Sequence, residues 1–395
     1  MTGVNPIIDV LGRRLRLAVI GGGPGSFIGA MHRTAARMDD RYELVAAALS
    51  SDPGRSRSAG QALGLEPDRA YDDGRALLEA EAQRTDGADV VAIMTPNDSH
   101  HAYASAALEL GFDVILDKPL SNTLGEALDL VDRTERLGRV LCLTHNYTGY
   151  TMVRQAKEMV GDGQLGEIRL VQVEYVQGGK AREVDHGDGG ELPWRYDPIR
   201  GGPSLVMGDI GTHAHNLVRF VTGLEVAEVA AEVGTIVPGS QQHDFAAAML
   251  RLTGGARGTF WVTQAAAGME NCLRIRVSGS RGTIEWAQEE PTFLIFRPLD
   301  EPAEIRTPGG PGTLPLAARS SRIVAGHPEA FHQAFANIYS DAAEAIAARR
   351  SGTRADPLAL HFPTARDGAV GVKFVDAAIG SSREGGRWTN ALLEI

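Results

Sequence analysis

The sequence predicts an α/β protein of two domains, in which a parallel sheet enclosed by helices precedes an α+β part with an open, mainly antiparallel sheet. As far as residue 145, short apolar runs that end in turn residues alternate with segments of helical spacing, the pattern of βαβ units. Six short strand candidates, separated by turn residues, follow later in the chain. A chain of 395 residues also exceeds what one compact core usually holds. We therefore predict domains at 14–145 and 146–395.

The first domain is expected to contain five buried strands with helices between them. Apolar runs predict strands at 15–20, 42–49, 89–94, 114–116 and 140–143. Helical spacing extends from the first glycine-rich turn to Met38 and recurs at 57–63, 101–110 and 124–137, each of the last three ending at a glycine. Strands that are apolar throughout are typical of a parallel sheet covered on both faces.

The second domain is expected to be built around consecutive short strands. An alternating strand at 168–176 precedes a glycine-rich loop at 178–202, and helices are expected at 152–160, 209–221 and 331–348. The six later strand candidates are 226–237, 244–252, 258–264, 273–278, 282–286 and 293–298. Strands that follow one another without intervening helices favour antiparallel pairing.

Composition argues against several classes of protein. The formal net charge is −11 and the basic residues form no dense block, so nucleic acid is not an expected partner. No run of about 18 apolar residues is present to cross a membrane, and residues 1–14 lack the apolar run of a signal peptide, so we expect a cytoplasmic protein. The two cysteines, Cys142 and Cys272, lie in apolar strands and are expected to be reduced core residues.

A glycine-rich loop joins the first strand to the first helix, with the sequence Gly21-Gly22-Gly23-Pro24-Gly25-Ser26-Phe27-Ile28-Gly29. Glycines at such a turn let the backbone approach a pyrophosphate, to which the helix N-terminus offers free N–H groups. The loop predicts a dinucleotide site of the Rossmann type, with contacts from Gly21, Gly23, Gly25, Ser26, Phe27 and Ile28. Gly29 lies three residues beyond the third position of the usual Gly-x-Gly-x-x-Gly pattern. A plain turn is the alternative, which the strand–helix context disfavours.

The end of the second strand bears on the choice of cofactor. Ser50 occupies the place where an acidic residue usually holds the ribose hydroxyls, and Ser51 and Asp52 follow it. Asp52 can still reach a ribose, whereas Arg55 and Arg57 suit a 2′-phosphate. We predict NAD with contacts from Ser50, Ser51 and Arg55, and NADP stays open.

Asp117-Lys118-Pro119 follows a predicted parallel strand directly. Ligands bind at the carboxyl ends of the strands in open α/β sheets. Pro119 fixes its own φ and restricts the residue before it. A lysine held rigidly beside a nicotinamide can hydrogen-bond a reacting hydroxyl or carbonyl oxygen. Lys118 is therefore a candidate catalytic residue, and an ordinary surface lysine is the alternative.

A second cluster lies in the segment Gly208–Asn216. Asp209 and His213 are separated by four residues, so they share one face of a helix, and a carboxylate there favours the protonated imidazole. Such a histidine suits proton exchange near neutral pH. His215 points away from His213. An N-cap role for Asp209 and a core position for His213 are the simpler alternatives.

At these residues the chain resembles the Gfo/Idh/MocA family, which covers glucose–fructose oxidoreductase, inositol dehydrogenase and rhizopine-catabolism proteins. The resemblance includes His32 after the glycine loop and Asp117-Lys118-Pro119 in place of the family's Glu-Lys-Pro. It also covers Thr95-Pro96-Asn97 with His100, and the Asp209-x-Gly211-x-His213 segment. It implies a Rossmann domain followed by an open sheet, whose exposed face makes homodimers or homotetramers.

The resemblance also implies roles for single residues. His213 would be the general base, Lys118 would polarise the reacting oxygen, and Asp209 would anchor the substrate or tune the pair. The cofactor contacts that it implies are Thr95, Pro96, Asn97, His100, Asp117, Lys118 and Asn146.

Four further polar or aromatic residues are candidates for the substrate pocket: Tyr147, His186, Trp194 and Arg195. Trp194 can stack on the apolar face of a sugar ring, and Arg195 can bind an anionic or hydroxyl-rich group. Packing beneath the loop and a structural salt bridge are the respective alternatives.

Three functions are consistent with these residues. The first is an NAD(P)-dependent dehydrogenase acting on a secondary alcohol of a sugar, glycoside or cyclitol. The second is a glycoside hydrolase that oxidises the sugar transiently at its 3-position, eliminates the aglycone and regenerates the cofactor. The third is a dinucleotide-binding sensor, which would not need Lys118, Asp209 and His213. Metal is not expected, because no other histidines and carboxylates cluster at ligand spacing.

Overall fold

The computed structural model describes residues 5–182 and 193–395 and divides into two compact units. Unit 1 comprises Met1–Ser121, Gly125–Gly149 and Phe331–Gly368. Unit 2 comprises Asn122–Leu124, Tyr150–Ala330 and Ala369–Ile395.

Unit 1 is built on a five-stranded parallel sheet in the order β2-β1-β3-β4-β5. Its strands are β1 (Leu15–Gly21), β2 (Tyr42–Ala48), β3 (Val90–Met94), β4 (Asp113–Leu116) and β5 (Leu141–Leu143). Every residue of β3, β4 and β5 is buried, which explains why these strands are apolar or nearly so. Strand β1 pairs with both β2 and β3, so the order reverses there and the ligand crevice of this fold opens at its carboxyl end. The predicted Rossmann sheet is confirmed.

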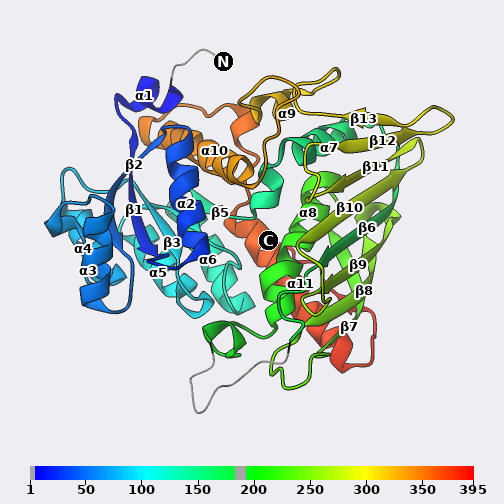
Figure 1. Cartoon of the computed structure of the whole chain (residues 1–395), viewed down its shortest axis with the longest axis horizontal. Coiled ribbons are helices and arrows are strands. Elements are labelled where there is room, and N and C mark those ends of the chain that lie inside the picture. The colour runs from blue at the N-terminus through cyan, green and yellow to red at the C-terminus, as the bar shows by residue number, and fades with distance from the viewer. Residues whose placement is uncertain (1–4, 183–192) are drawn as a thin grey trace. The chain divides into compact units, whose positions relative to one another are not determined.

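The helices of unit 1 pack around this sheet (Figure 1). They are α1 (Pro6–Leu11), α2 (Phe27–Met38), α3 (Pro53–Ala62), α4 (Gly74–Gln83), α5 (His100–Glu109), α6 (Leu124–Arg136) and α10 (Phe331–Ser351). The side chain of Asp52 caps α3 and that of Asp73 caps α4, each by accepting hydrogen bonds from first-turn N–H groups.

Helix α10 comes late in the chain but belongs to unit 1, whereas our predicted boundary assigned it to the second domain. It packs on α2, where the Tyr339 hydroxyl lies 2.7 Å from His32 Nδ1. The Tyr42 hydroxyl donates to the main-chain oxygen of Tyr339 at 2.8 Å, and the Phe335 ring meets the edge of the His32 ring. The difference arises because sequence position says nothing about where a buried helix packs.

Unit 2 contains a nine-stranded sheet in the order β13-β12-β11-β10-β6-β9-β8-β7-β14, in which only β6 and β9 pair in parallel among the described residues. Its strands are β6 (Ile168–Val176), β7 (Val226–Gly234), β8 (Phe245–Leu252), β9 (Arg257–Thr263), β10 (Cys272–Gly279), β11 (Gly282–Ala287), β12 (Leu294–Pro298), β13 (Glu304–Arg306) and β14 (Thr389–Asn390). Its helices are α7 (Thr151–Gly161), α8 (Thr212–Thr222), α9 (Pro315–Arg319) and most of α11 (Ala365–Arg383). The six predicted strands are confirmed.

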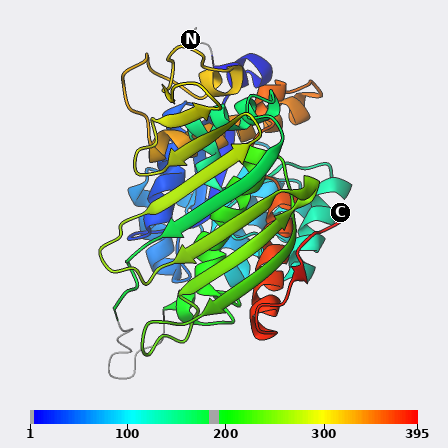
Figure 2. The same ribbon diagram turned by 90° about the vertical axis from the view of Figure 1, so that its right-hand side faces the viewer.

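One face of this sheet is uncovered in the part of the chain that the structure describes, as Figure 2 shows. Burial alternates along the strands, so that in β9 Phe260 and Val262 are buried while Thr259 and Trp261 are exposed. Phe260 meets Phe374 of α11 on the covered face. The open, mainly antiparallel sheet is therefore also confirmed.

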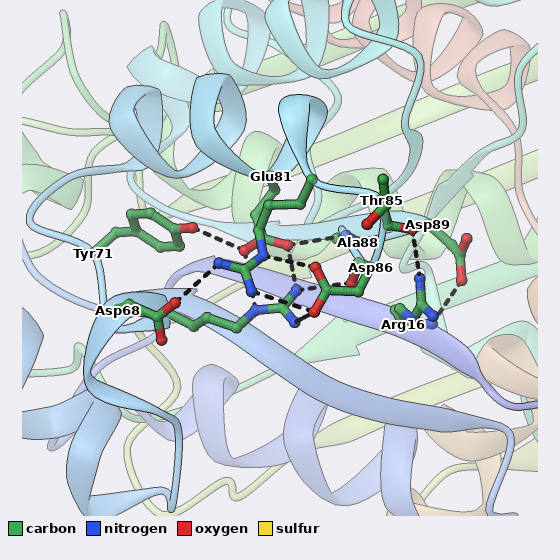
Figure 3. A network of polar contacts seen from close by, with 10 residues as sticks. Arg16, Asp68, Tyr71, Glu81, Thr85, Asp86, Ala88 and Asp89 are labelled. Atoms are coloured by element: carbon green, nitrogen blue, oxygen red, sulfur yellow. Dashed lines mark hydrogen bonds and ion pairs between the residues drawn. The ribbon is translucent and has the colours of Figure 1, made fainter.

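A buried ion pair joins the turn Pro67–Arg69, which lies between α3 and α4, to α4 within unit 1 (Figure 3). Arg69 donates through Nε to Glu81 Oε1 at 3.1 Å, and the Glu81 side chain is fully buried. The Tyr71 hydroxyl donates to the same oxygen, and the Ala88 N–H donates to Oε2. Because each oxygen has partners, the charge of Glu81 is compensated, and removing it would leave the Arg69 charge poorly paired.

We expect Glu81→Gln to lower the free energy of unfolding by about 3 kcal/mol, because it leaves the buried Arg69 paired only with the half-exposed Asp86 at 3.5 Å. Glu79→Gln on the same helix is the control. Its carboxylate is exposed and pairs with Arg75, so about 0.5 kcal/mol is expected. Urea denaturation measures both values, and equal losses would show that the buried pair stabilises the fold no more than the exposed one.

Candidate active site

The glycine loop brings the end of β1 against the start of α2. Ser26 caps α2, and its hydroxyl accepts from the Gly29 N–H at 3.1 Å. A Cβ added at Gly29 would clash with the Gly22 carbonyl, and one added at Gly22 would clash with the Met94 side chain. Gly29 thus allows the close strand–helix packing that the third glycine of the usual pattern provides, although it lies three residues later. The spacing that looked irregular in the sequence reflects a longer loop with the same contact.

This loop fits a dinucleotide. Gly22 and Gly25 have φ of +66° and +83°, which side chains rarely tolerate, and so the backbone can turn sharply beneath a phosphate group. The first-turn N–H groups of α2 have no partners within the helix, so they can bind an anion. Arg33 Nη1 donates to the Gly22 oxygen at 2.6 Å and braces the loop from the side of the helix. Contacts to a cofactor from Gly21, Gly23, Gly25, Ser26, Phe27 and Ile28 stay a prediction.

The residues after β2 form a tight turn into α3. The Ser50 hydroxyl accepts from the Asp52 N–H at 3.1 Å, and Asp52 Oδ1 accepts from the Arg55 N–H at 2.7 Å. Asp52 therefore serves as an N-cap, which leaves only its other oxygen for a ribose. Arg57 pairs with Asp72. Contacts from Ser50, Ser51 and Arg55 to a cofactor stay a prediction.

His100 links the loop after β3 to the loop after β4. Its Nδ1 lies 2.8 Å from the Pro119 oxygen and its Nε2 lies 3.0 Å from the Thr95 oxygen, while its ring is fully buried. Burial lowers the pKa of His100, and the nearby Asp117 charge opposes that shift only in part. The structure thus gives His100 a bracing role. Cofactor contacts from Thr95, Pro96, Asn97 and His100 itself stay predictions.

Lys118 follows β4 between a carboxylate and a cis-proline peptide bond. Asp117 Oδ1 accepts from the Lys118 N–H and from the Thr144 hydroxyl, each at 3.0 Å. His32 Nε2 lies 3.9 Å from the same oxygen. Burial alone would raise the pKa of Asp117, but His32 and the charges of Lys118 and His100 outweigh it and lower the pKa to about 2. The main chain of Lys118 is therefore anchored by an ionised side chain.

Asn146 and Tyr147 lie in a short 3₁₀ turn after β5, and both are buried. The Asn146 Nδ2 has no hydrogen-bond partner among the described residues. A buried amide donor without a partner is costly, so this atom suits an acceptor on a bound molecule, such as the cofactor. Tyr147 stays a prediction as a substrate contact.

In unit 2, the predicted helix at 209–221 begins with a π-helical turn, Met207–Gly211, before α8 starts at Thr212. Asp209 lies in the π turn and His213 in the first turn of α8, where it is 7% exposed. Such wide turns are frequent at functional sites because they displace a side chain from regular helical spacing. His215 stacks on Phe374 at 4.3 Å and is a core residue, as its direction in the sequence indicated.

A chain of polar side chains runs from Asp209 across the ends of neighbouring strands. Its links are Gln264 Nε2 to Asp209 Oδ2 at 2.8 Å, Gln264 Nε2 to Gln177 Oε1 at 3.1 Å, and Gln177 Nε2 to Asn271 Oδ1 at 2.6 Å. The Tyr175 hydroxyl joins Asn271 Oδ1 at 2.8 Å, and its ring lies 6.5 Å from that of His213. Sequence reasoning missed these residues. The available signal was that Gln177 and Gln264 directly follow the parallel pair β6 and β9.

The remaining loop candidates are only partly described. Trp194 and Arg195 lie in a 3₁₀ turn, where the Arg195 guanidinium stacks 4.3 Å from the Trp194 ring. One face of the indole is therefore occupied by a cation. His186 lies outside the described residues.

Comparisons with known proteins match both parts of the chain. A model of the oxidoreductase family with an NAD-binding Rossmann fold matches residues 15–145, and one of the GFO/IDH/MocA C-terminal domain matches residues 153–285. The chain belongs to the Gfo/Idh/MocA family. It is an NAD-binding oxidoreductase within a family of sugar and cyclitol dehydrogenases.

Three relatives illustrate the match. The oxidoreductase YfiI of Bacillus subtilis is 31% identical over 383 residues, 96% of this chain and 97% of its own. An oxidoreductase structure from Sinorhizobium meliloti is 45% identical with a TM-score of 0.87, covering 96% of this chain and all of that one. An inositol dehydrogenase homologue from Azotobacter vinelandii, solved with NAD⁺, is 36% identical with a TM-score of 0.92, covering 99% and 100%.

No group of three or more histidine, cysteine or acidic side chains among the described residues could hold a metal ion. No helix in the described ranges is both long and apolar enough to cross a membrane. Cys142 and Cys272 are both buried and free, as expected.

We expect Gly29→Ala to weaken NAD binding by about tenfold or more, because the added methyl group must push Gly22 out of the loop. Gly125→Ala in α6 is the control, since nothing lies within 4 Å of its added Cβ. Calorimetric titration with NAD measures both affinities. Equal binding by the two variants would contradict the role assigned to Gly29.

We expect Asp117→Asn to lower the free energy of unfolding by about 2 kcal/mol at pH 7, because the ionised carboxylate has a pKa of about 2 instead of the usual 3.8. A carboxyl whose pKa is lower in the folded protein than in the unfolded chain stabilises the folded state at pH values above its unfolded pKa. The difference from wild type should therefore hold above about pH 4 and shrink as pH falls towards 2. Denaturation curves across that range test it, with the exposed Asp132→Asn as a control that should change little. A difference in unfolding free energy that does not change with pH would show that ionisation of Asp117 does not stabilise the folded state.

Proposed function

We propose that this protein transfers a hydride between NAD and a secondary alcohol of a sugar, glycoside or cyclitol. The observation that carries the proposal is that each unit holds its candidate catalytic residues in place by neighbouring groups. Unit 1 presents Lys118, anchored at the carboxyl end of β4 in an NAD-binding fold. Unit 2 presents the buried His213 together with Asp209, whose carboxylate is held by Gln264.

Bound NAD supplies the acceptor for the hydride that leaves the carbinol carbon. The glycine loop and the N-terminus of α2 would hold its pyrophosphate, with the Asn146 amide as a further donor. In the direction of oxidation, His213 would take the hydroxyl proton as general base while Lys118 hydrogen-bonds the same oxygen. Lys118 would thereby stabilise the negative charge that develops there. Asp209 would accept from a hydroxyl of the substrate and fix its orientation.

The residues of the long loop would shape the pocket around this centre. Trp194, Arg195, Tyr147 and His186 stay proposals for substrate contact. NADP stays the alternative to NAD as cofactor, and assembly into homodimers or homotetramers and a cytoplasmic location are likewise predictions from the sequence. The comparisons do not favour transient oxidation followed by glycoside cleavage, because the matched relatives are dehydrogenases and other oxidoreductases.

The test is a panel of inositols, free sugars and glycosides incubated with the purified protein and NAD. NADH absorbance and release of free aglycone are followed together. We expect NADH to accumulate with at least one polyol and no aglycone to appear. Aglycone release without net NADH would overturn the dehydrogenase in favour of redox-assisted cleavage. Calorimetric NAD binding with no reaction across a broad panel would favour a sensor.

His213→Asn tests the proposed general base on the best substrate of the panel. Loss of a general base typically lowers kcat by about 100-fold or more, so we expect at least that for His213→Asn with little change in NAD affinity. His215→Asn is the matched control, because His215 stacks in the core. A His213 variant that keeps the kcat of wild type would contradict its role as base.

A further inference from the structure

Gln264 carries a buried acceptor that no described residue of the protein uses. The residue is 3% exposed, at the end of β9. Its Nε2 donates to Asp209 Oδ2 at 2.8 Å and to Gln177 Oε1 at 3.1 Å, which uses both amide hydrogens. Its Oε1 has no hydrogen-bond partner among the described residues. Buried acceptors without partners are uncommon and costly, so the atom suits a donor on a bound molecule.

The orientation of this amide follows from its neighbours. Asp209 can only accept when ionised, so the group of Gln264 that faces it must be the NH₂. Gln177 presents its oxygen to Gln264 because its own Nε2 donates to Asn271 Oδ1 at 2.6 Å. The atom of Asn271 that faces Gln177 Nε2 is therefore its oxygen, which also lies 2.8 Å from the Tyr175 hydroxyl, while Asn271 Nδ2 donates to Gln288 Oε1 at 3.0 Å. Turning the Gln264 amide over would place oxygen against oxygen at two contacts, so Oε1 is the atom left over.

We propose that Gln264 Oε1 accepts a hydrogen bond from a second hydroxyl of the substrate, one that is not oxidised. The inference rests on the proposed function, because it places that hydroxyl beside the one held by Asp209. Gln264 Nε2 and Oε1 belong to one amide group, so a molecule bound to Asp209 lies within reach of Oε1. Gln264 is thereby a specificity-determining residue that selects polyols over simple secondary alcohols.

The chemistry of the acceptor defines which groups it selects. An amide oxygen binds a hydroxyl hydrogen, but it gains nothing from a methylene, a fluorine or a methyl ether in the same place. Sites built to hydrogen-bond a hydroxyl reject analogues that lack it more strongly than apolar pockets reject an extra methylene. A substrate that loses this one hydroxyl should bind worse, while the loss of a hydroxyl elsewhere should matter less.

The experiment uses the full-length protein, NAD and the best polyol from the panel, together with its complete series of monodeoxy analogues. We expect one position other than the oxidised one at which wild-type kcat/KM falls about tenfold or more. In Gln264→Leu that particular loss should shrink to about twofold, because the partner is already gone. Gln264→Met serves the same purpose if the leucine variant does not fold. The proposal would be overturned if each deoxy analogue lowered kcat/KM by the same factor in wild type and variant. It would also be overturned if the wild type kept its kcat/KM after the loss of any hydroxyl other than the oxidised one.

Gln155→Leu is the matched control. Gln155 is a buried glutamine of the same unit whose two ends are bound by the backbone of Gly312 and Leu314. Its loss should affect stability but leave the pattern across the deoxy series unchanged. If Gln155→Leu also erased the tenfold loss, a general loosening of unit 2 would explain the effect and the proposal would fall.

Binding to the enzyme–NADH complex, followed by NADH fluorescence, separates this inference from the proposed function. If polyols bind but no NADH is formed from NAD, the proposed dehydrogenase function is overturned. The affinities of the deoxy analogues would still test the role of Gln264. A series in which Gln264→Leu changes no analogue's relative affinity would show that Oε1 holds only a water molecule. Absence of all polyol binding would overturn both proposals.

Discussion

The Asp117 carboxylate lies at a point where several segments of unit 1 meet, and the geometry on that side of the sheet depends on it. It accepts from the Lys118 N–H after β4 and from the Thr144 hydroxyl after β5, and it faces His32 of α2. His32 is held in turn by Tyr339 of α10. A charge in so buried a place is tolerated only because each neighbour compensates it. The consequence is a main chain held in place at Lys118, as its proposed contact with one reacting oxygen requires.

In unit 2 a carboxylate is also held in place by hydrogen bonds, here from neutral amide groups. Hydrogen bonds link Asp209 through Gln264 and Gln177 to Asn271, and these bonds define the direction of each amide. Networks of this kind specify one arrangement because a single reversed amide leaves several groups unpaired. These amides thus hold Asp209 in place and leave Gln264 Oε1 without a partner among the described residues. Selection among polyols would then depend on complementarity to a preformed polar wall, with little need for a change of shape on binding.

Family membership and chemistry rest on different observations. The two family matches and the glycine loop establish an NAD-binding oxidoreductase, yet one fold can support several reactions. The distinction between dehydrogenase, glycoside cleavage and sensing depends on which proton-transfer groups are held rigidly and which substrate hydroxyls are recognised. Lys118, Asp209 and His213 are therefore the residues whose variants are informative, and Gln264 extends the question from reaction type to substrate.

The sequence alone determined the strands and the order of the motifs, because a buried parallel strand must be apolar throughout and a half-buried one must alternate. It identified the glycine loop, Lys118 and the Asp209/His213 segment, since these are local patterns of residue type and spacing. Only the tertiary structure decided that α10 packs on α2, that Gly29 meets Gly22, and that Gln177, Gln264 and Asn271 join Asp209. These contacts connect residues that lie far apart in the chain or in an unusual register. Glutamine and asparagine carry no distinctive pattern of their own, so their role became visible only where strand pairing placed the ends of β6 and β9 side by side.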